Sequence, residues 1–165
     1  MKKICSIILV TIIGVLFLGF SNVSAKGHHV HHYHTVMGLR RARHPKFKVN
    51  SKVYLETGAR KYMRHSHAKV VGVYRSKLYE VNYRPKHRKH VIRHYHWLVY
   101  KQISGHLRRG AHVRLKSNYG HMRSAYATII DINNGPAYMV NYRPTNGGYV
   151  IKNYKWLSQS ELKRR

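Results

Sequence analysis

Short stretches in which apolar and polar residues alternate recur through most of the chain. In YEVNY (79–83) the first, third and fifth residues are apolar and the second and fourth are polar, which places the apolar side chains on one face of a strand. Comparable stretches, rich in β-branched and aromatic residues, end at turn-forming sequences such as NNGP (133–136) and PTNGG (144–148). The pattern therefore predicts β-strands, and no segment after Ala25 has a convincing helical period.

The same strand pattern occurs twice. YEVNYRP (79–85) and YMVNYRP (138–144) differ at one position, and in the same register of 59 residues HVIRHYHWL (90–98) matches YVIKNYKWL (149–157). Five short strands in each copy, with a Trp on a late strand, predict a small SH3-like barrel. The expected fold is all-β, with two tandem SH3-like β-barrel modules at residues 47–103 and 107–162. The aromatic and valine residues of the repeated strands are expected to build the core rather than a binding stripe, namely Tyr79, Val81, Tyr83, Trp97, Tyr138, Val140, Tyr142 and Trp156.

The N-terminus has the layout of a secretory signal peptide over residues 1–25. Lys2 and Lys3 precede an apolar run, and small residues lead up to Ala25. The alternative is a retained N-terminal membrane anchor, and in both cases we expect a secreted or cell-surface protein. Cys5 is the single cysteine and would leave with the signal. The mature chain would then have no disulfide, no thiolate catalysis and no Cys-bound metal.

Residues 26–46 carry few large apolar side chains and are dense in His and Arg, which predicts a flexible tail. After cleavage behind Ala25, the free amine of Lys26 and the imidazole of His28 would form a square-planar site for Cu(II) or Ni(II). The neighbouring histidines could hold Zn(II), Cu(II) or Ni(II) as a group. The alternative is a solvated cationic tail. The candidate metal ligands are Lys26, His28, His29, His31, His32 and His34.

Two His-x-His steps form a further candidate for metal binding. His65 and His67, and His94 and His96, are spaced to point to one face of a strand. The second copy has Ser124 and Tyr126, and Asn153 and Lys155, at the corresponding positions. The scaffold therefore does not require histidine there, and surface charge is the alternative interpretation.

Positive charge dominates the composition, because 32 Lys and Arg face only 4 Asp and Glu and the formal net charge is +28. Such a surface attracts anionic polymers, with binding that weakens steeply as salt rises. The expected partners are anionic wall polymers or an anionic membrane surface, with extracellular nucleic acid as an alternative and no small-molecule substrate. Protonation of histidine would strengthen binding in acid. The candidate polyanion-binding residues are Arg40, Arg41, Arg43, Arg84, Lys86, Arg88, Lys89, Arg93, Arg108, Arg109, Arg143, Lys163, Arg164 and Arg165.

Acid–base catalysis is limited by the scarcity of carboxylates. Glu56, Glu80, Asp131 and Glu161 are the only acids and are scattered over both copies, so a carboxylate pair or a Ser-His-Asp triad is not expected. A phosphodiester-cleaving site made of His and Lys alone is the alternative. We therefore expect a protein that is not an enzyme and that requires no cofactor.

The second copy resembles the YdhK family, a domain of unknown function that usually occurs as tandem copies in exported bacterial proteins. The resemblance spans nearly all of residues 47–162. Its most specific part is Tyr-x-Val-x-Tyr-x-Pro-Thr-x-Gly-Gly followed by Asn-x-Lys-Trp, which covers residues 138–156. The first copy departs from this run at KHRKH (86–90), and Tyr95 and Tyr154 stand where other members carry His. The resemblance implies export and tandem modules but no activity.

Three functions are consistent with these observations. The first is an exported, non-enzymatic protein that binds anionic polymers of the cell envelope electrostatically. The second is an extracellular protein that binds Cu, Ni or Zn through its His-rich N-terminus. The third is binding of nucleic acid, which Tyr beside Arg would favour by stacking on bases.

Overall fold

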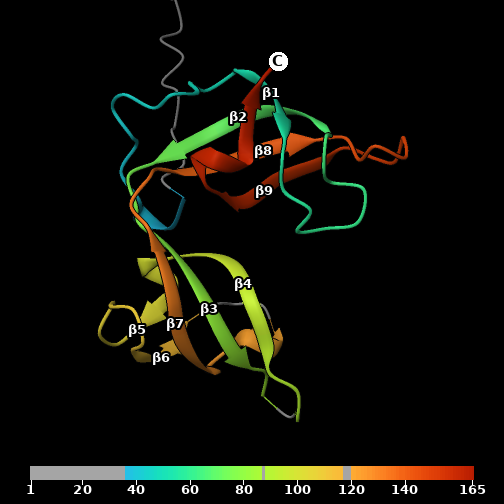
Figure 1. Ribbon diagram of the computed structural model, residues 1–165. Coiled ribbons are helices and arrows are strands. Elements are labelled where there is room, and N and C mark those ends of the chain that lie inside the picture. The colour runs from blue at the N-terminus through green and yellow to red at the C-terminus, as the bar shows by residue number, and fades with distance from the viewer. Residues whose placement is uncertain (1–35, 87, 117–119) are drawn as a thin grey trace, which may run out of the picture. The chain divides into compact units, whose positions relative to one another are not determined.

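The computed structural model describes residues 36–86, 88–116 and 120–165, which belong to a single unit, His34–Arg165 (Figure 1). Within these ranges the helical elements are short 3-10 turns, and no helix is long and apolar enough to cross a membrane. The prediction of an all-β fold is confirmed. The elements are η1 (Val36–Gly38), β1 (Lys52–Leu55), β2 (His67–Tyr74), β3 (Leu78–Arg84), β4 (Ile92–Val99), η2 (Tyr100–Gln102), β5 (Ile103–Ser104), β6 (His112–Leu115), η3 (Gly120–Met122), β7 (Tyr126–Asn133), β8 (Ala137–Tyr142), β9 (Ile151–Leu157), η4 (Gln159–Glu161) and β10 (Leu162–Arg164).

The strands form two five-stranded antiparallel sheets, and each sheet takes strands from both repeats. Sheet I has the order β10-β1-β2-β8-β9, and sheet II has the order β4-β3-β7-β6-β5. The first repeat supplies β1 to β5 and the second supplies β6 to β10, so the two sheets do not coincide with the repeats. This differs from the expectation that residues 47–103 and 107–162 each close into a barrel of their own. The repeats instead exchange strands.

The exchange occurs at two equivalent connections. Residues 75–77 lead from β2 in sheet I to β3 in sheet II, and residues 134–136 lead from β7 in sheet II to β8 in sheet I (Figure 1). NNGP, predicted as a turn, thus contains a link between sheets, and it does not fold β7 back onto β8. PTNGG does form a turn, in which the Gly147 N–H donates to the Pro144 carbonyl over 3.0 Å.

The repeats are joined at the centre of both sheets. Val70 of β2 lies opposite Val140 of β8 in sheet I, and Val81 of β3 lies opposite Ile129 of β7 in sheet II. All four side chains are fully buried. Burial of strands from both repeats in each core makes the folding of one repeat depend on the other.

Three hydrophobic clusters form the core. One belongs to the strands of sheet I and one to those of sheet II. The third gathers residues from both sheets, including the equivalent pairs Leu78 and Ala137, and Trp97 and Trp156. The structural role predicted for the repeated aromatic and valine residues is confirmed, because all are buried: Tyr79, Val81, Tyr83, Trp97, Tyr138, Val140, Tyr142 and Trp156.

The part of the predicted tail that the structure describes is packed against the sheets. Leu39 is only 1% exposed and belongs to the third cluster. The Ala42 N–H donates to the Val73 carbonyl over 3.1 Å, and the Arg75 N–H donates to the Arg40 carbonyl over 2.8 Å. The expectation of a flexible segment over 26–46 is therefore wrong for residues 36–46, because a buried leucine and backbone pairing with the end of β2 hold them in place. Residues 26–35 lie outside the described residues.

Candidate functional site

A groove of about 700 Å³ lies between β4 and β9, the edge strands of sheets II and I. One wall is residues 92–96 of β4 and the other is residues 151–155 of β9. These segments correspond to each other in the register of 59 residues, so the groove is bounded by the same strand taken from each repeat. Loop residues before β2 and residues of η3 complete the lining. We call this site the β4–β9 groove.

The asparagine of the repeated VNYRP phrase shapes each wall. Asn82 Oδ1 accepts a hydrogen bond from the His94 N–H over 2.9 Å, and Asn141 Oδ1 accepts one from the Asn153 N–H over 2.8 Å. Both donor residues have positive φ, 52° for His94 and 54° for Asn153, a conformation that interrupts the regular ladder. The side chain on the neighbouring strand replaces the missing backbone partner. This explains why the same asparagine appears in both copies.

Tyrosines contribute the half-buried part of each wall. Tyr95 packs edge-to-face on Tyr83 with ring centroids 5.6 Å apart, and Tyr154 packs in the same way on Tyr142 at 5.7 Å. Burial raises the pKa of Tyr83 and of Tyr154 to about 12, although Arg60 acts to lower the pKa of Tyr154. Tyr154 is therefore a neutral phenol at physiological pH and adds no negative charge to the groove.

Cations line the groove from several elements. Arg93 and Lys152 occupy equivalent positions on the two walls, Lys155 lies further along β9, and Arg60 comes from the loop between β1 and β2. The Arg60 guanidinium carbon lies 5.6 Å from the centroid of the Tyr154 ring. Among the described residues, no Asp or Glu lines the groove. The site is consequently suited to an anion and unsuited to a cation.

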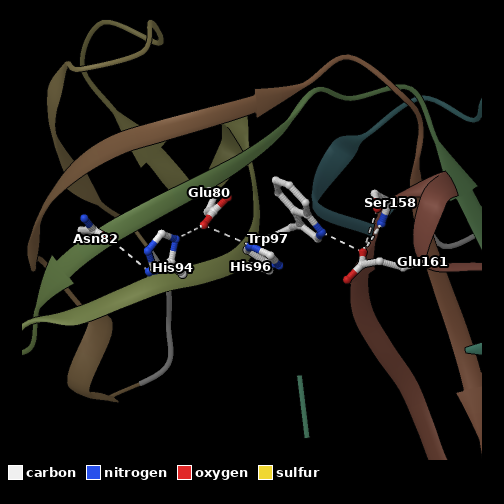
Figure 2. A network of polar contacts seen from close by, with 7 residues as sticks. All are labelled: Glu80, Asn82, His94, His96, Trp97, Ser158 and Glu161. Carbon is white, nitrogen blue, oxygen red and sulfur yellow. Dashed lines mark hydrogen bonds and ion pairs between the residues drawn. The ribbon is translucent and has the colours of Figure 1, made fainter. Parts of the chain in front are cut away.

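His94 and His96 converge on one buried carboxylate (Figure 2). His94 Nδ1 lies 2.7 Å and His96 Nε2 lies 3.1 Å from the same oxygen, Glu80 Oε1. Glu80 is only 9% exposed, and these contacts satisfy a charge that would otherwise be costly to bury. In the second repeat the corresponding residues are Met139, Asn153 and Lys155. The histidines thus hold a carboxylate on one wall only.

The other His-x-His step does not bring its rings together on one partner. His65 Nδ1 lies 3.9 Å from Glu56 Oε2, whereas the His67 ring packs edge-to-face on Tyr54 with centroids 4.8 Å apart. In the described ranges no three His, Cys, Asp or Glu side chains are placed so that they could hold a metal ion. The predicted metal ligands of the N-terminus all lie outside the described residues: Lys26, His28, His29, His31, His32 and His34.

The predicted polyanion-binding residues are all exposed, but they are spread over several places. Arg93 lies in the β4–β9 groove, and Arg40, Arg41 and Arg43 line a separate hollow. The others lie on strand ends, loops and turns and at the C-terminus: Arg84, Lys86, Arg88, Lys89, Arg108, Arg109, Arg143, Lys163, Arg164 and Arg165. Sequence reasoning missed Arg60, Lys152 and Lys155 of the groove. The register of 59 could have revealed Lys152, because it is the counterpart of Arg93.

Three of the four acids form ion pairs or hydrogen bonds with residues other than lysine or arginine. Glu56 pairs with His65, and Glu80 with the two histidines of β4. Glu161 Oε2 accepts hydrogen bonds from Trp97 Nε1 and from the Ser158 N–H, both over 2.7 Å (Figure 2). Strand exchange also places Glu80 opposite Asp131, which corrects the expectation that the acids are all dispersed. The carboxylates therefore do little to neutralise the lysines and arginines.

Comparison with known proteins identifies relatives for most of the chain. The family model described as "Protein of unknown function (DUF1541)" matches residues 109–159. The uncharacterized protein YdhK of Bacillus subtilis (strain 168) is 32% identical over 130 residues, which cover 76% of this chain and 63% of YdhK. The match thus spans less than two thirds of the length of that relative.

Solved structures agree with the all-β fold. A crystal structure of the DUF1541 family protein ydhK from Bacillus subtilis has a TM-score of 0.73 and 32% identity, and the match covers 78% of this chain and 90% of that chain. A solution NMR structure of the ydhK C-terminal domain has a TM-score of 0.67 and 31% identity, covering 72% of this chain and 94% of that chain.

Proposed function

This chain belongs to the DUF1541 family of proteins of unknown function, and we propose that it binds anionic polymers of the cell envelope by electrostatic attraction. The proposal is for an exported protein, secreted or held at the cell surface, that acts by binding rather than by catalysis. It requires no metal or other cofactor. The observation that carries it is the β4–β9 groove, whose described lining contains cations from several elements and no acid.

The internal repeat favours a polymer over a single small anion. Arg93 and Lys152 occupy equivalent positions on facing walls, so the groove presents a similar cation from each side. A chain with regularly spaced phosphates can contact both walls, and each contact releases counterions condensed on the polymer. The neutral phenol of Tyr154 adds an uncharged surface between the cations. A polymer of phosphodiesters, such as a phosphate-rich wall polymer, therefore suits the site best.

The test is a titration of the secreted protein with poly(glycerol phosphate) at several salt concentrations. We expect saturable binding that weakens as salt rises. Replacing both wall cations, Arg93→Gln with Lys152→Gln, should weaken binding about tenfold at low salt. Because each lost phosphate contact reduces the slope of log K against log salt by about 0.7 for a single-stranded polyanion, the double variant should lose about 1.4 from this slope.

A matched control removes the same charge elsewhere. Lys52→Gln with Lys69→Gln alters exposed residues of β1 and β2 that do not line the groove, and should change the affinity less than twofold. Equal losses in both double variants would contradict a role for the groove. Single-stranded DNA and anionic lipid vesicles serve as comparison ligands, and markedly tighter binding of either would favour that class of partner instead of a wall polymer.

A further inference from the structure

The exchange of strands creates a second hollow of about 830 Å³ beside the two connections that link the sheets. Residues 75–77 and residues 134–136, which correspond in the register of 59, both line it. The N-terminal segment 40–45 also lines it, held by backbone hydrogen bonds of Arg40 with Arg75 of the first connection and of Ala42 with Val73 of β2. We call this site the crossover hollow.

The rim of the crossover hollow is strongly basic. Arg40 and Arg43 come from the N-terminal segment, and Arg75 and Lys77 come from the first connection. All four side chains are exposed, and in the part of the chain that the structure describes no Asp or Glu lines the hollow. Two separate segments of backbone thus direct cations to the same place, which strengthens attraction for an anion without an opposing carboxylate.

Part of the remaining lining is apolar, beside polar residues such as Ser76 and Asn134. Leu107 and Pro136 contribute apolar surface, and Tyr100 contributes an aromatic ring that is 40% exposed. Lys101 Nζ lies 5.3 Å from the centroid of this ring. A bare inorganic anion would use only the cations. A ligand that also carries a sugar or base ring can cover the apolar surface.

We propose that the crossover hollow binds a ring-bearing phosphate, either a sugar phosphate or a nucleotide, with the phosphate at Arg40, Arg43, Arg75 and Lys77 and the ring against Tyr100 and Pro136. The site is distinct from the β4–β9 groove and does not depend on its function. It would let the protein hold a phosphate-bearing unit and a polymer strand at separate places.

Calorimetry with glucose 1-phosphate, uridine monophosphate and inorganic phosphate tests this assignment at low salt. We expect a ring-bearing phosphate to bind saturably at one site and at least fivefold more tightly than inorganic phosphate. The tighter of the two ring-bearing probes shows whether the source is a sugar phosphate or a nucleotide. Tyr100→Ala should weaken binding of that probe about fivefold and leave binding of inorganic phosphate unchanged.

Charge variants locate the site. Arg75→Gln with Lys77→Gln should weaken binding at least tenfold, whereas Lys52→Gln with Lys69→Gln, which has the same change of charge, should alter it less than twofold. The groove variant Arg93→Gln with Lys152→Gln should leave binding of these probes unchanged, so a failure of the polymer proposal would not be confused with a failure here. Equal losses in the hollow and control variants, or inorganic phosphate binding as tightly as both other probes, would overturn the assignment.

Discussion

The two walls of the β4–β9 groove share a backbone and differ in charge. Each wall has the same tyrosine packed edge-to-face and a backbone N–H bonded to the repeated asparagine. Behind the first wall a buried glutamate holds two histidines, whereas the second has Met139, Asn153 and Lys155 at those positions. The comparison shows that the hydrogen bonds that fix the backbone recur in both repeats, while the electrostatic groups are free to differ.

A second pair of equivalent bonds crosses between the repeats. Trp97 Nε1 donates to Glu161 Oε2 over 2.7 Å, and Trp156 Nε1 donates to Gln102 Oε1 over 3.0 Å. Gln102 and Glu161 correspond in the register of 59 residues. The indole N–H of each repeat therefore donates to the other repeat, and the two acceptors occupy equivalent positions. Again the geometry is repeated, while the charge of the acceptor is not.

The largest effect should come from separating the repeats. Residues 105–165 alone lack β1 and β2 of sheet I and β3, β4 and β5 of sheet II, so side chains such as Val140 and Ile129, fully buried in the whole chain, would be exposed. We expect this fragment to lose the entire free energy of unfolding, about 5–15 kcal/mol for an ordinary domain. Structure should return only when two copies pair with each other or when residues 36–104 are added.

Circular dichroism and sedimentation at several concentrations would check this. The control is the equimolar mixture of the two fragments, which should regain the β-sheet signal of the intact chain. If residues 105–165 were a folded monomer at every concentration, one repeat would fold on its own. The two repeats would then be independent modules.

An intermediate effect is expected at the two tryptophan acceptors. Gln102 is 7% exposed, and its Oε1 accepts from Trp156 Nε1 and from the Val99 N–H over 3.1 Å. Gln102→Glu would place a carboxylate in this buried position, at a cost of about 2–4 kcal/mol. Glu161→Gln keeps an oxygen acceptor and loses only the charge-assisted part of the bonds, about 1 kcal/mol.

Urea unfolding of both variants near pH 7 measures the difference. Gln102→Glu should have a clearly lower free energy of unfolding than Glu161→Gln. Gln102→Ala and Glu161→Ala are suitable controls, because both remove the acceptor altogether and leave the indole N–H unsatisfied. If Gln102→Glu and Glu161→Gln lowered the free energy of unfolding by the same amount, a difference in burial between the two acceptors would be contradicted.

The strands were predictable from sequence, but their partners were not. Alternation in YEVNY identifies a strand and its buried face, and burial of Tyr79, Val81 and Tyr83 confirms this. Alternation does not specify which strand lies alongside. The link at residues 134–136 has the composition of a turn, and the same composition also suits a three-residue link to another sheet. Pairing of β3 with β7 depends on contacts between residues far apart in sequence.

The candidate site was predictable only in part for a related reason. Arg93 was singled out as basic, and its counterpart Lys152 follows from the repeat. Arg60 reaches the groove from a loop that precedes β2, and no local pattern shows this. The convergence of His94 and His96 on Glu80 depends on irregular pairing of β3 with β4 on either side of Val81. Alternation alone cannot predict the offset that these irregularities produce.

The smallest effect on stability should come from making the first wall identical to the second. The triple variant Glu80→Met, His94→Asn and His96→Lys introduces the residues that already occupy these positions in the other repeat. Asparagine tolerates the positive φ of position 94, as Asn153 does at 54°. We expect the free energy of unfolding to change by less than about 1 kcal/mol.

The single variant Glu80→Met provides the contrast. It removes the shared acceptor of His94 and His96 while leaving both rings in place, and should cost about 1–2 kcal/mol. The triple variant should therefore be more stable than this single variant, because the three residues act as a unit. It also replaces a carboxylate and a histidine with a neutral side chain and a lysine, so poly(glycerol phosphate) should bind several-fold more tightly at low salt, with the gain shrinking as salt rises. Additive costs of the three substitutions in urea unfolding would show that the histidines and the glutamate stabilise the wall independently, and that the second repeat is not an interchangeable version of the first.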